Sequence, residues 1–144
     1  MTNRAVVIKL DPRRIETVDR PVDELIAGEV IVKSMQVGVC RSDIEMLDGN
    51  HDDPMPPYPV VVGHEWAGFV EEVGPGVTGI SVGDHVVMSI VPNCGECEWC
   101  KRGIPNYCAT AGDAMSVGGL FDKTSRLSEN GNKLNQFLCV ASFA

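Results

Sequence analysis

The feature of this sequence that most constrains its fold is a run of four cysteines within fifteen residues. The spacing is C-x2-C-x2-C-x7-C, and the residues are Cys94, Cys97, Cys100 and Cys108. Four thiolates this close along the chain can surround one ion tetrahedrally. Zn²⁺ favours that ligand set, and such a shell leaves no position open for water. The spacing therefore predicts a structural zinc site in a lobe rich in Gly, Cys and Pro, over about residues 92–112.

The spacing alone leaves two other uses of these cysteines open. Disulfides are typical of secreted chains, but the sequence begins with Met1-Thr2-Asn3-Arg4 and a short Val/Ile run, which lacks the pattern of a signal peptide. An iron–sulfur cluster of the bacterial ferredoxin type has the spacing C-x2-C-x2-C-x3-C-Pro. Here the last gap is seven residues, and Ala109 follows it. Zinc in a cytoplasmic protein is the interpretation that we favour.

The composition limits the classes of partner. The chain has 144 residues, a formal net charge of −8 and no run of Lys or Arg, which argues against nucleic acid or an anionic membrane as a partner. It has no stretch of 18 apolar residues, so no segment is expected to span a membrane. A length of this order fits one domain, over residues 1–144, or part of a larger protein.

The distribution of Val and Ile predicts a mostly β fold with few short helices. The expected strands, each bounded by Gly, Pro or Asp, are Ala5–Leu10, Glu29–Val39, Val60–Val73, His85–Val91 and Asn135–Ala144. A short helix is expected over Ser42–Leu47, with Ser42 as its N-cap and Glu45 three residues later. Residues 92–119 show little periodicity, for which a bound metal supplies a reason. Because the last strand stops at Ala144, we expect a truncated domain with an unpaired edge.

A second group of possible metal ligands lies near the start of the chain. Cys40 follows one expected strand, and His64 and Glu65 lie within the next. A catalytic zinc takes three protein ligands and keeps one open position, and these three residues can supply that set. Asp43 is then a candidate to orient His64 from behind. A buried cysteine and a core histidine without a metal explain the same residues, and Cys139 has no partner motif at all.

These motifs together resemble the zinc-containing, medium-chain alcohol dehydrogenases. The resemblance covers essentially the whole chain, but only the front part of a full family member. The end of the chain is most similar to the longer alcohol dehydrogenases and the glutathione-dependent formaldehyde dehydrogenases. Besides the four-cysteine loop, the stretches that carry the resemblance are Gly63-His64-Glu65-x2-Gly68-x5-Gly74-x2-Val77, Gly38-Val39-Cys40-Arg41-Ser42-Asp43, Gly83-Asp84-His85-Val86 and Thr124-Ser125-Arg126 through Phe143.

The resemblance implies a fold and a reaction. The fold is a partly open GroES-like β-barrel with a protruding structural-zinc lobe. The reaction is hydride transfer between a small alcohol or aldehyde and NAD(P), with zinc as Lewis acid, in an enzyme that is a homo-oligomer when full length. The Rossmann domain is not contained in this chain, so we expect the isolated chain to be catalytically incomplete and to hold its second zinc weakly.

The resemblance also implies individual roles. Cys40 and His64 are the first two ligands of the catalytic zinc, and Glu65 lies next to the metal and can exchange onto it. The third cysteine ligand of the family has no counterpart here. Ser42 takes the position of the hydroxyl that contacts the substrate oxygen and starts a proton relay. Arg41 takes the position that contacts the cofactor pyrophosphate.

One position departs from the family, and one stretch imitates another motif. Glu45 stands where many members have a relay histidine, and His51 is interpreted as a surface residue of the proline-rich loop. The stretch Gly74-Pro75-Gly76-Val77-Thr78-Gly79 matches G-x-G-x-x-G, but no helix is expected after it, so we interpret it as a turn between strands. A non-enzymatic zinc-binding GroES-like module is the alternative function, supported by fold analogy alone.

Overall fold

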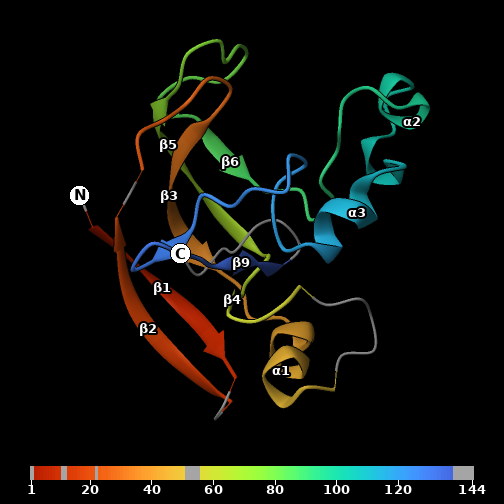
Figure 1. Cartoon of the computed structure of the whole chain (residues 1–144). Coiled ribbons are helices and arrows are strands. Elements are labelled where there is room, and N and C mark those ends of the chain that lie inside the picture. Colours follow the sequence, from red (N-terminus) through yellow and green to blue (C-terminus); the bar gives the residue numbers. More distant parts are fainter. Residues whose placement is uncertain (1, 11–12, 22, 51–55, 138–144) are drawn as a thin grey trace.

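A computed structural model describes residues 2–10, 13–21, 23–50 and 56–137 of the chain. The architecture is mostly β with a few short helices, as the sequence predicts (Figure 1). In chain order the elements are β1 (Thr2–Lys9), β2 (Arg14–Pro21), β3 (Val30–Val37), α1 (Arg41–Asp48), β4 (Val60–Val61), β5 (Trp66–Val73), β6 (His85–Val87), α2 (Glu98–Lys101), the 3-10 helix η1 (Pro105–Tyr107), α3 (Ala111–Ser116), β7 (Ser128–Glu129), β8 (Asn132–Lys133) and β9 (Asn135–Gln136).

The first sheet has the strand order β2-β1-β4-β9 and carries the core. β1 and β2 form an antiparallel pair, whereas β4 and β9 run parallel. Side chains of a strand alternate between the two faces, and here the buried positions of β1 are Ala5, Val7 and the neighbouring Ile8. Val60 and Val61 of β4 are fully buried. Apolar burial on this sheet is the main stabilising term of the fold.

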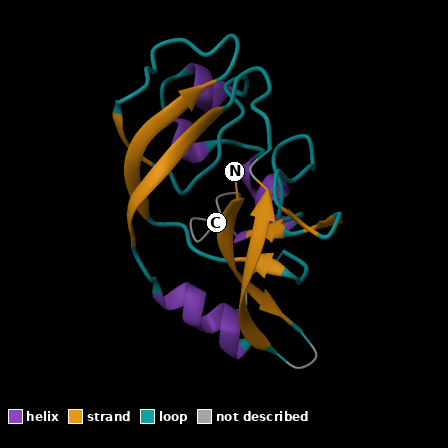
Figure 2. Ribbon diagram, turned by 90° about the vertical axis from the view of Figure 1, so that its left-hand side faces the viewer, coloured by secondary structure: helices purple, strands orange, loops and turns teal. Residues whose placement is uncertain are grey.

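The second sheet has the order β3-β5-β6 and is antiparallel throughout. A two-stranded sheet of β7 and β8 completes the described strands. Figures 1 and 2 show the two larger sheets as separate groups of strands, with α1 at the lower end of the molecule. The described sheets are not closed into one barrel, which agrees with the expected partly open form.

Helix α1 packs its inner face on the core and places the second group of metal ligands at its start. Met46 is fully buried in a cluster with Ile8 and Phe137. The expected N-cap, Ser42, is wrong by two residues, because the helix begins after Cys40. Asp43 occupies the third helical position, and its carboxylate Oδ2 accepts a hydrogen bond from the Cys40 backbone N–H at 2.9 Å. This reciprocal cap satisfies a backbone donor that the helix leaves free.

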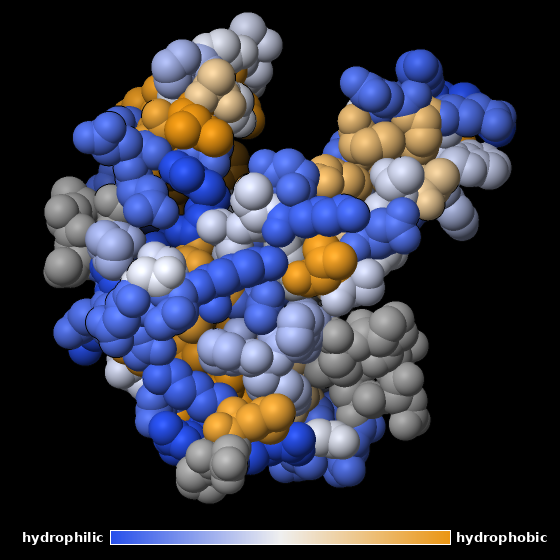
Figure 3. Space-filling view, in the orientation of Figure 1, coloured by the Kyte–Doolittle hydropathy of each residue, from blue (hydrophilic) through white to orange (hydrophobic). Residues whose placement is uncertain are grey.

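The four-cysteine segment stands out from the body of the protein, as expected for a protruding lobe (Figures 1 and 3). Residues 92–119 show little periodicity in the sequence, yet the structure has the short helices α2, η1 and α3 there. These helices are three to six residues long, which is too short for a hydrophobic periodicity to be visible in the sequence.

One strand prediction needs correction, one strand was not predicted, and one prediction is tested only in part. The single strand expected over Val60–Val73 is two strands, β4 and β5, separated by an irregular stretch over 62–65. The strand β2 was not expected at all, because polar residues occupy most of its positions. The strand expected over Asn135–Ala144 begins as β9, and its part beyond residue 137 lies outside the described residues.

The G-x-G-x-x-G stretch that starts at Gly74 is a turn, as predicted. It leads from β5 toward β6, and the next described element after it is this strand and not a helix. The Gly74 backbone N–H donates to the Glu29 carbonyl at 2.8 Å, which ties this turn to the segment before β3. None of the helices in the described part of the chain has the length and apolar character that crossing a bilayer requires.

Candidate metal centres

The four predicted cysteines of the lobe meet in space. One sulfur from each of them lies within 4.8 Å of the other three. The five described cysteines are free thiols, and Cys97 Sγ lies 3.5 Å from Cys100 Sγ. Backbone N–H groups point at the sulfurs: Cys94 N–H donates to Cys108 Sγ at 3.4 Å, and Cys97 N–H donates to Cys94 Sγ at 3.3 Å. The donor set and its geometry fit a structural zinc site.

Hydrogen bonding and burial act in opposite directions on these thiols. The Thr110 hydroxyl, together with weaker backbone hydrogen bonds, lowers the pKa of Cys108 from its ordinary 9.0 to about 6. Burial acts in the opposite direction but is outweighed. A backbone hydrogen bond from Ala109 lowers the pKa of Cys97. Burial, with a smaller contribution from the Cys97 thiol, raises the pKa of Cys100 to about 11. Since zinc binds thiolates, binding must release protons from this cluster.

Tight turns and a small aromatic cluster shape the lobe around the sulfurs. Gly95 has φ 73° and Gly103 has φ 77°, a region that favours glycine and lets the backbone turn tightly around an ion. Trp99 stacks on Tyr107 with ring centroids 5.9 Å apart, and the Arg102 guanidinium lies 5.0 Å from the Trp99 ring. These contacts connect α2 to η1 and hold the cysteines of both segments together.

The second predicted group also comes together. Cys40, His64 and Glu65 each place one ligand atom within 4.8 Å of the other two. Cys40 precedes α1, and the other two lie between β4 and β5, so the group joins the two sheets at the start of the helix. His64 is 4% exposed, whereas Glu65 is exposed. A thiolate, an imidazole and a carboxylate with one side toward solvent fit a zinc ion with an open position.

Asp43 braces both ligand-bearing segments from the buried side. Its Oδ2 accepts the N–H of Cys40 at 2.9 Å, and its Oδ1 accepts the N–H of Gly63 at 3.0 Å. Oδ1 also lies 3.5 Å from His64 Nδ1, which has no hydrogen-bond partner within the described residues. The imidazole therefore presents Nδ1 to a carboxylate and keeps Nε2 for a ligand, which is the usual arrangement behind a metal-bound histidine.

Ser42 and Arg41 are neighbours in the first turn of α1 but differ in exposure, since Ser42 is half-buried and Arg41 is exposed. Ser42 Oγ lies 3.5 Å from His64 Nε2, at the edge of the second group. The Arg41 side chain is 82% exposed, and its Nε lies 2.9 Å from Glu45 Oε1. Glu45, the residue at the expected relay position, is thus engaged by Arg41.

Phe137 contacts His64 directly, and Gly68 lets the strand after His64 pack closely on β3. The Phe137 ring packs edge-on against the imidazole, with centroids 5.3 Å apart. Gly68 lies so close to β3 that a Cβ there would overlap the Lys33 carbonyl oxygen, which explains the glycine in the motif around His64. Phe137 carries no sequence signal, because a distant apolar residue cannot be paired with a given histidine from one sequence. His51 and Cys139 lie outside the described residues.

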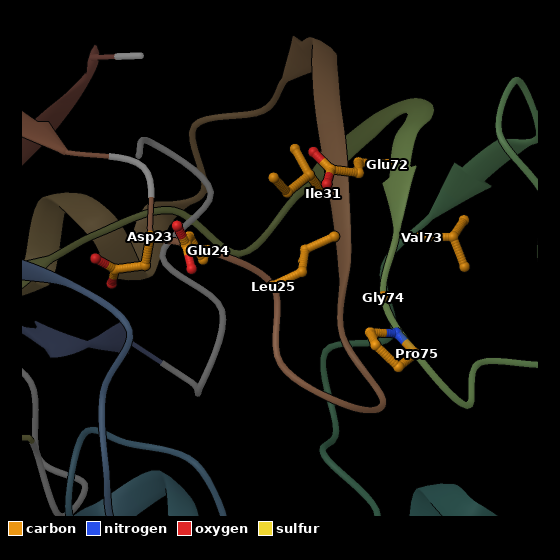
Figure 4. A pocket seen from close by; sticks show the side chains of 8 residues that line it. All are labelled: Asp23, Glu24, Leu25, Ile31, Glu72, Val73, Gly74 and Pro75. Atoms are coloured by element: carbon orange, nitrogen blue, oxygen red, sulfur yellow. The ribbon is translucent and has the colours of Figure 1, made fainter.

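A separate pocket of about 500 Å³ lies beside the turn between β5 and β6. Figure 4 shows its walls, with Asp23 and Glu24 on one side and Ile31 and Glu72 on neighbouring strands. The residues that line it include no thiol or imidazole, and none belongs to either metal group. We therefore place the chemistry at the two ligand clusters and not in this pocket.

Known proteins are similar to this chain in sequence and in fold. The model of the family described as the alcohol dehydrogenase GroES-like domain matches residues 26–133. A curated relative, the S-(hydroxymethyl)glutathione dehydrogenase of Escherichia coli O1:K1 / APEC, is 40% identical over 144 residues, which is 100% of this chain and 38% of the relative. The chain thus spans well under half the length of the curated relatives that it matches.

Solved structures of alcohol dehydrogenases are also similar to this chain. The benzyl alcohol dehydrogenase of Acinetobacter calcoaceticus aligns with a TM-score of 0.83 and 30% identity, over 99% of this chain and 37% of that one. A thermostable alcohol dehydrogenase from Pyrobaculum aerophilum, solved with cobalt and zinc bound, aligns with a TM-score of 0.66 and 33% identity, over 78% of this chain and 34% of that one. The GroES-like fold that the motifs implied is confirmed by these likenesses.

Proposed function

The chain belongs to the family of alcohol dehydrogenase GroES-like domains, and from this premise we propose that it is the zinc-binding part of an NAD(P)-dependent alcohol dehydrogenase. The reaction is hydride transfer between a small alcohol or aldehyde and the nicotinamide. Residues 1–144 form one GroES-like domain with its zinc lobe at about 92–112. The full-length protein is proposed to act as a homo-oligomer.

One observation carries the proposal: Cys40, His64 and Glu65 place their ligand atoms within 4.8 Å of one another at a partly exposed position. A purely structural site would use a closed set of four ligands, as the lobe does. An open set beside a serine hydroxyl and a buried aspartate favours catalysis over a non-enzymatic zinc-binding module. Zinc bound there would supply a Lewis acid toward an alcohol oxygen, with NAD(P) as hydride acceptor.

The chain's own residues divide the remaining work. The Cys40 thiolate and the His64 imidazole would hold the ion, and a carboxylate oxygen of Glu65 would be the third donor. Asp43 keeps the imidazole in the orientation that leaves Nε2 free for the ion. The Ser42 hydroxyl, 3.5 Å from that nitrogen, is placed to accept a hydrogen bond from a bound alcohol and to start a proton relay, in which it would take the alcohol's proton while its own passes to water. Arg41 offers an exposed guanidinium to the cofactor pyrophosphate.

Within the class of small alcohols, the relatives supply two candidate substrates. The benzyl alcohol dehydrogenase is similar in structure, with a TM-score of 0.83, and the S-(hydroxymethyl)glutathione dehydrogenase is similar in sequence, with 40% identity. The second candidate agrees with the resemblance of the segment after Thr124 to glutathione-dependent formaldehyde dehydrogenases. Both are primary alcohols, so the same proton acceptor and the same metal ligands serve either one.

Binding of benzyl alcohol to the zinc-loaded chain tests the proposal. Ligand-observed NMR of the chain with both sites filled should show binding that needs zinc and is lost in Cys40→Ser. The lobe variant Cys97→Ser is the matched control, because it removes a thiol from the other cluster. Zinc-independent binding, or no binding with the second site demonstrably filled, would favour the non-enzymatic module instead.

A further inference from the structure

Gly38 lies directly against the side chain of Glu65. A Cβ at Gly38 would overlap the Glu65 carboxylate oxygen Oε2, and it would stand 3.1 Å from Glu65 Cβ and 3.2 Å from Cδ. The two residues are joined through the backbone as well, since Gly38 N–H donates to the Glu65 carbonyl at 2.9 Å. The carboxylate therefore occupies the space that any other residue at position 38 would fill with its own side chain.

A β-bulge sets this juxtaposition. In the ladder between β3 and β5, Ser34 is paired with Gly68, but the next pair is Gln36 with Ala67, so Met35 has no partner in the register. The shift places Val37 opposite Trp66 and brings Gly38 next to Glu65. Without the extra residue, Val37 would face Glu65, and its branched side chain would fill the space of the carboxylate.

The contact with Gly38 also places the Glu65 carboxylate at the second metal centre. In this position one carboxylate oxygen of Glu65 lies within 4.8 Å of the Cys40 and His64 ligand atoms. The structure gives the carboxylate no ion pair or hydrogen bond to another described side chain, so the space above Gly38 is what defines its place. Gly38 does not have a positive φ, so its backbone does not itself demand glycine.

We propose that Gly38 is a positioning residue of the second metal centre, because its missing side chain leaves the space in which the Glu65 carboxylate stands as the third zinc donor. The proposal rests on the proposed function of Cys40 and His64 as zinc ligands. A methyl group at position 38 displaces the end of a flexible side chain rather than the backbone. Gly38→Ala should therefore fold and lose only the third donor.

Zinc affinity of the second site, measured by competition with a chromophoric chelator, tests the proposal in the full chain. The variants are Gly38→Ala, Glu65→Ala and the double variant, with Cys40→Ser as a probe of the site itself. Gly112→Ala is the matched control, because its Cβ would meet nothing within 4 Å and its φ is not positive. Thermal unfolding of the zinc-free proteins reports any loss of the fold.

Gly38→Ala is expected to weaken zinc at this site about as much as Glu65→Ala does, on the order of 10–100-fold. The double variant should be no weaker than Glu65→Ala, since Gly38 acts through the carboxylate. An unchanged affinity in Gly38→Ala or Glu65→Ala, or additive losses in the double variant, would overturn the proposal. If Cys40→Ser binds zinc as tightly as wild type does, Cys40 is not a ligand, and both the proposed metal centre and this inference are contradicted. That pattern differs from a failure of Gly38 alone.

Discussion

Asp43 Oδ1 lies 3.5 Å from His64 Nδ1, and both side chains are only 3% exposed. The same carboxylate accepts the backbone N–H groups of Cys40 and Gly63. One buried acid thus connects the start of α1 with the segment between β4 and β5, which are the two places that supply metal ligands. Asp43 therefore positions both ligand-bearing segments of the second metal centre.

Removal of that carboxylate should weaken both the fold and the metal centre. Asp43→Ala leaves two backbone donors without their acceptor, which should lower the free energy of unfolding by about 1–3 kcal/mol. Zinc affinity at the second site should fall roughly 10–100-fold through the loss of the residue behind His64. Urea unfolding and chelator competition measure the two effects. Asp43→Asn is the control, because it keeps the shape and one acceptor oxygen, so its loss of stability should be smaller.

Zinc affinity should distinguish the ligands of the second site from its neighbours. His64→Ala should abolish zinc binding there, whereas Ser42→Ala should leave the zinc affinity unchanged, because the hydroxyl is a proposed proton acceptor and not a ligand. The same competition titration checks both variants. A loss of zinc in Ser42→Ala would mean that the hydroxyl, at 3.5 Å from His64 Nε2, belongs to the ligand set instead.

The lobe should unfold locally when its metal is removed. Trp99 stacks on Tyr107 in the lobe, and the only other tryptophan of the chain is Trp66 in β5. A strong chelator should therefore change the tryptophan emission, since metal binding and local folding are coupled. Trp99→Phe should remove most of the response. A response that persists in this variant would place the change near β5 and contradict a local event.

An ion-pair cluster formed by β1, β2 and β7 should make stability depend on pH. Lys9 Nζ lies 2.8 Å from both Glu16 Oε2 and Glu129 Oε2. The Lys9 ammonium holds the pKa of Glu16 below its ordinary 4.5, and the carboxylates of Glu129 and Glu16 raise the pKa of Lys9 above 10.5. The contribution of Glu16 is present above pH 4.5 and is lost as the pH falls through its lowered folded-state pKa. That of Lys9 is present below pH 10.5 and is lost at still higher pH.

Glu16→Gln should therefore be less stable than wild type at pH 7, by a small amount because the pair is partly solvated. The difference should be smaller at pH 3, because Glu16 is then largely protonated in the unfolded chain. Urea unfolding at the two pH values measures it, and Glu71→Gln on an exposed position of β5 is the control. A difference that is the same at both pH values would rule out an electrostatic origin.

The sheet of β3, β5 and β6 carries an exposed apolar surface, which should make the chain self-associate. Val87 is 77% exposed, Val39 67% and Met35 57%, and β3 and β6 are the two edges of the sheet. Unpaired edges and apolar patches favour association. Light scattering should show a mass that rises with concentration, and Val87→Lys should reduce the rise. A monomer at every concentration would contradict this prediction.

The lobe could be predicted from the sequence because its ligands are neighbours along the chain. The spacing of Cys94, Cys97, Cys100 and Cys108 already limits where their sulfurs can go, and the turns at Gly95 and Gly103 follow from it. The short helices between them could not be predicted, because segments of three to six residues carry no usable periodicity.

The second centre is harder, because its geometry depends on contacts between distant segments. The residue types of Cys40, His64 and Glu65 indicate only a possible ligand set, and the roles in it come from the family resemblance. The bulge at Met35 that brings Gly38 to Glu65, and the packing of Phe137 on His64, depend on register and tertiary contacts that a single sequence does not encode visibly. The N-cap was misplaced for a related reason. Ser42 is the better intrinsic cap, but the reciprocal bond between Asp43 and Cys40 begins the helix two residues earlier.

The most direct test of two distinct metal centres is the zinc content per chain, measured by elemental mass spectrometry in wild type, Cys97→Ser and Cys40→Ser. With excess zinc present, wild type should hold about two ions, and each variant should lose one of them. After brief dialysis against a mild chelator, wild type and Cys40→Ser should both keep about one, because the four-cysteine site is closed and the other is open. Iron in place of zinc, or a zinc content that neither variant changes, would contradict the two-centre structure.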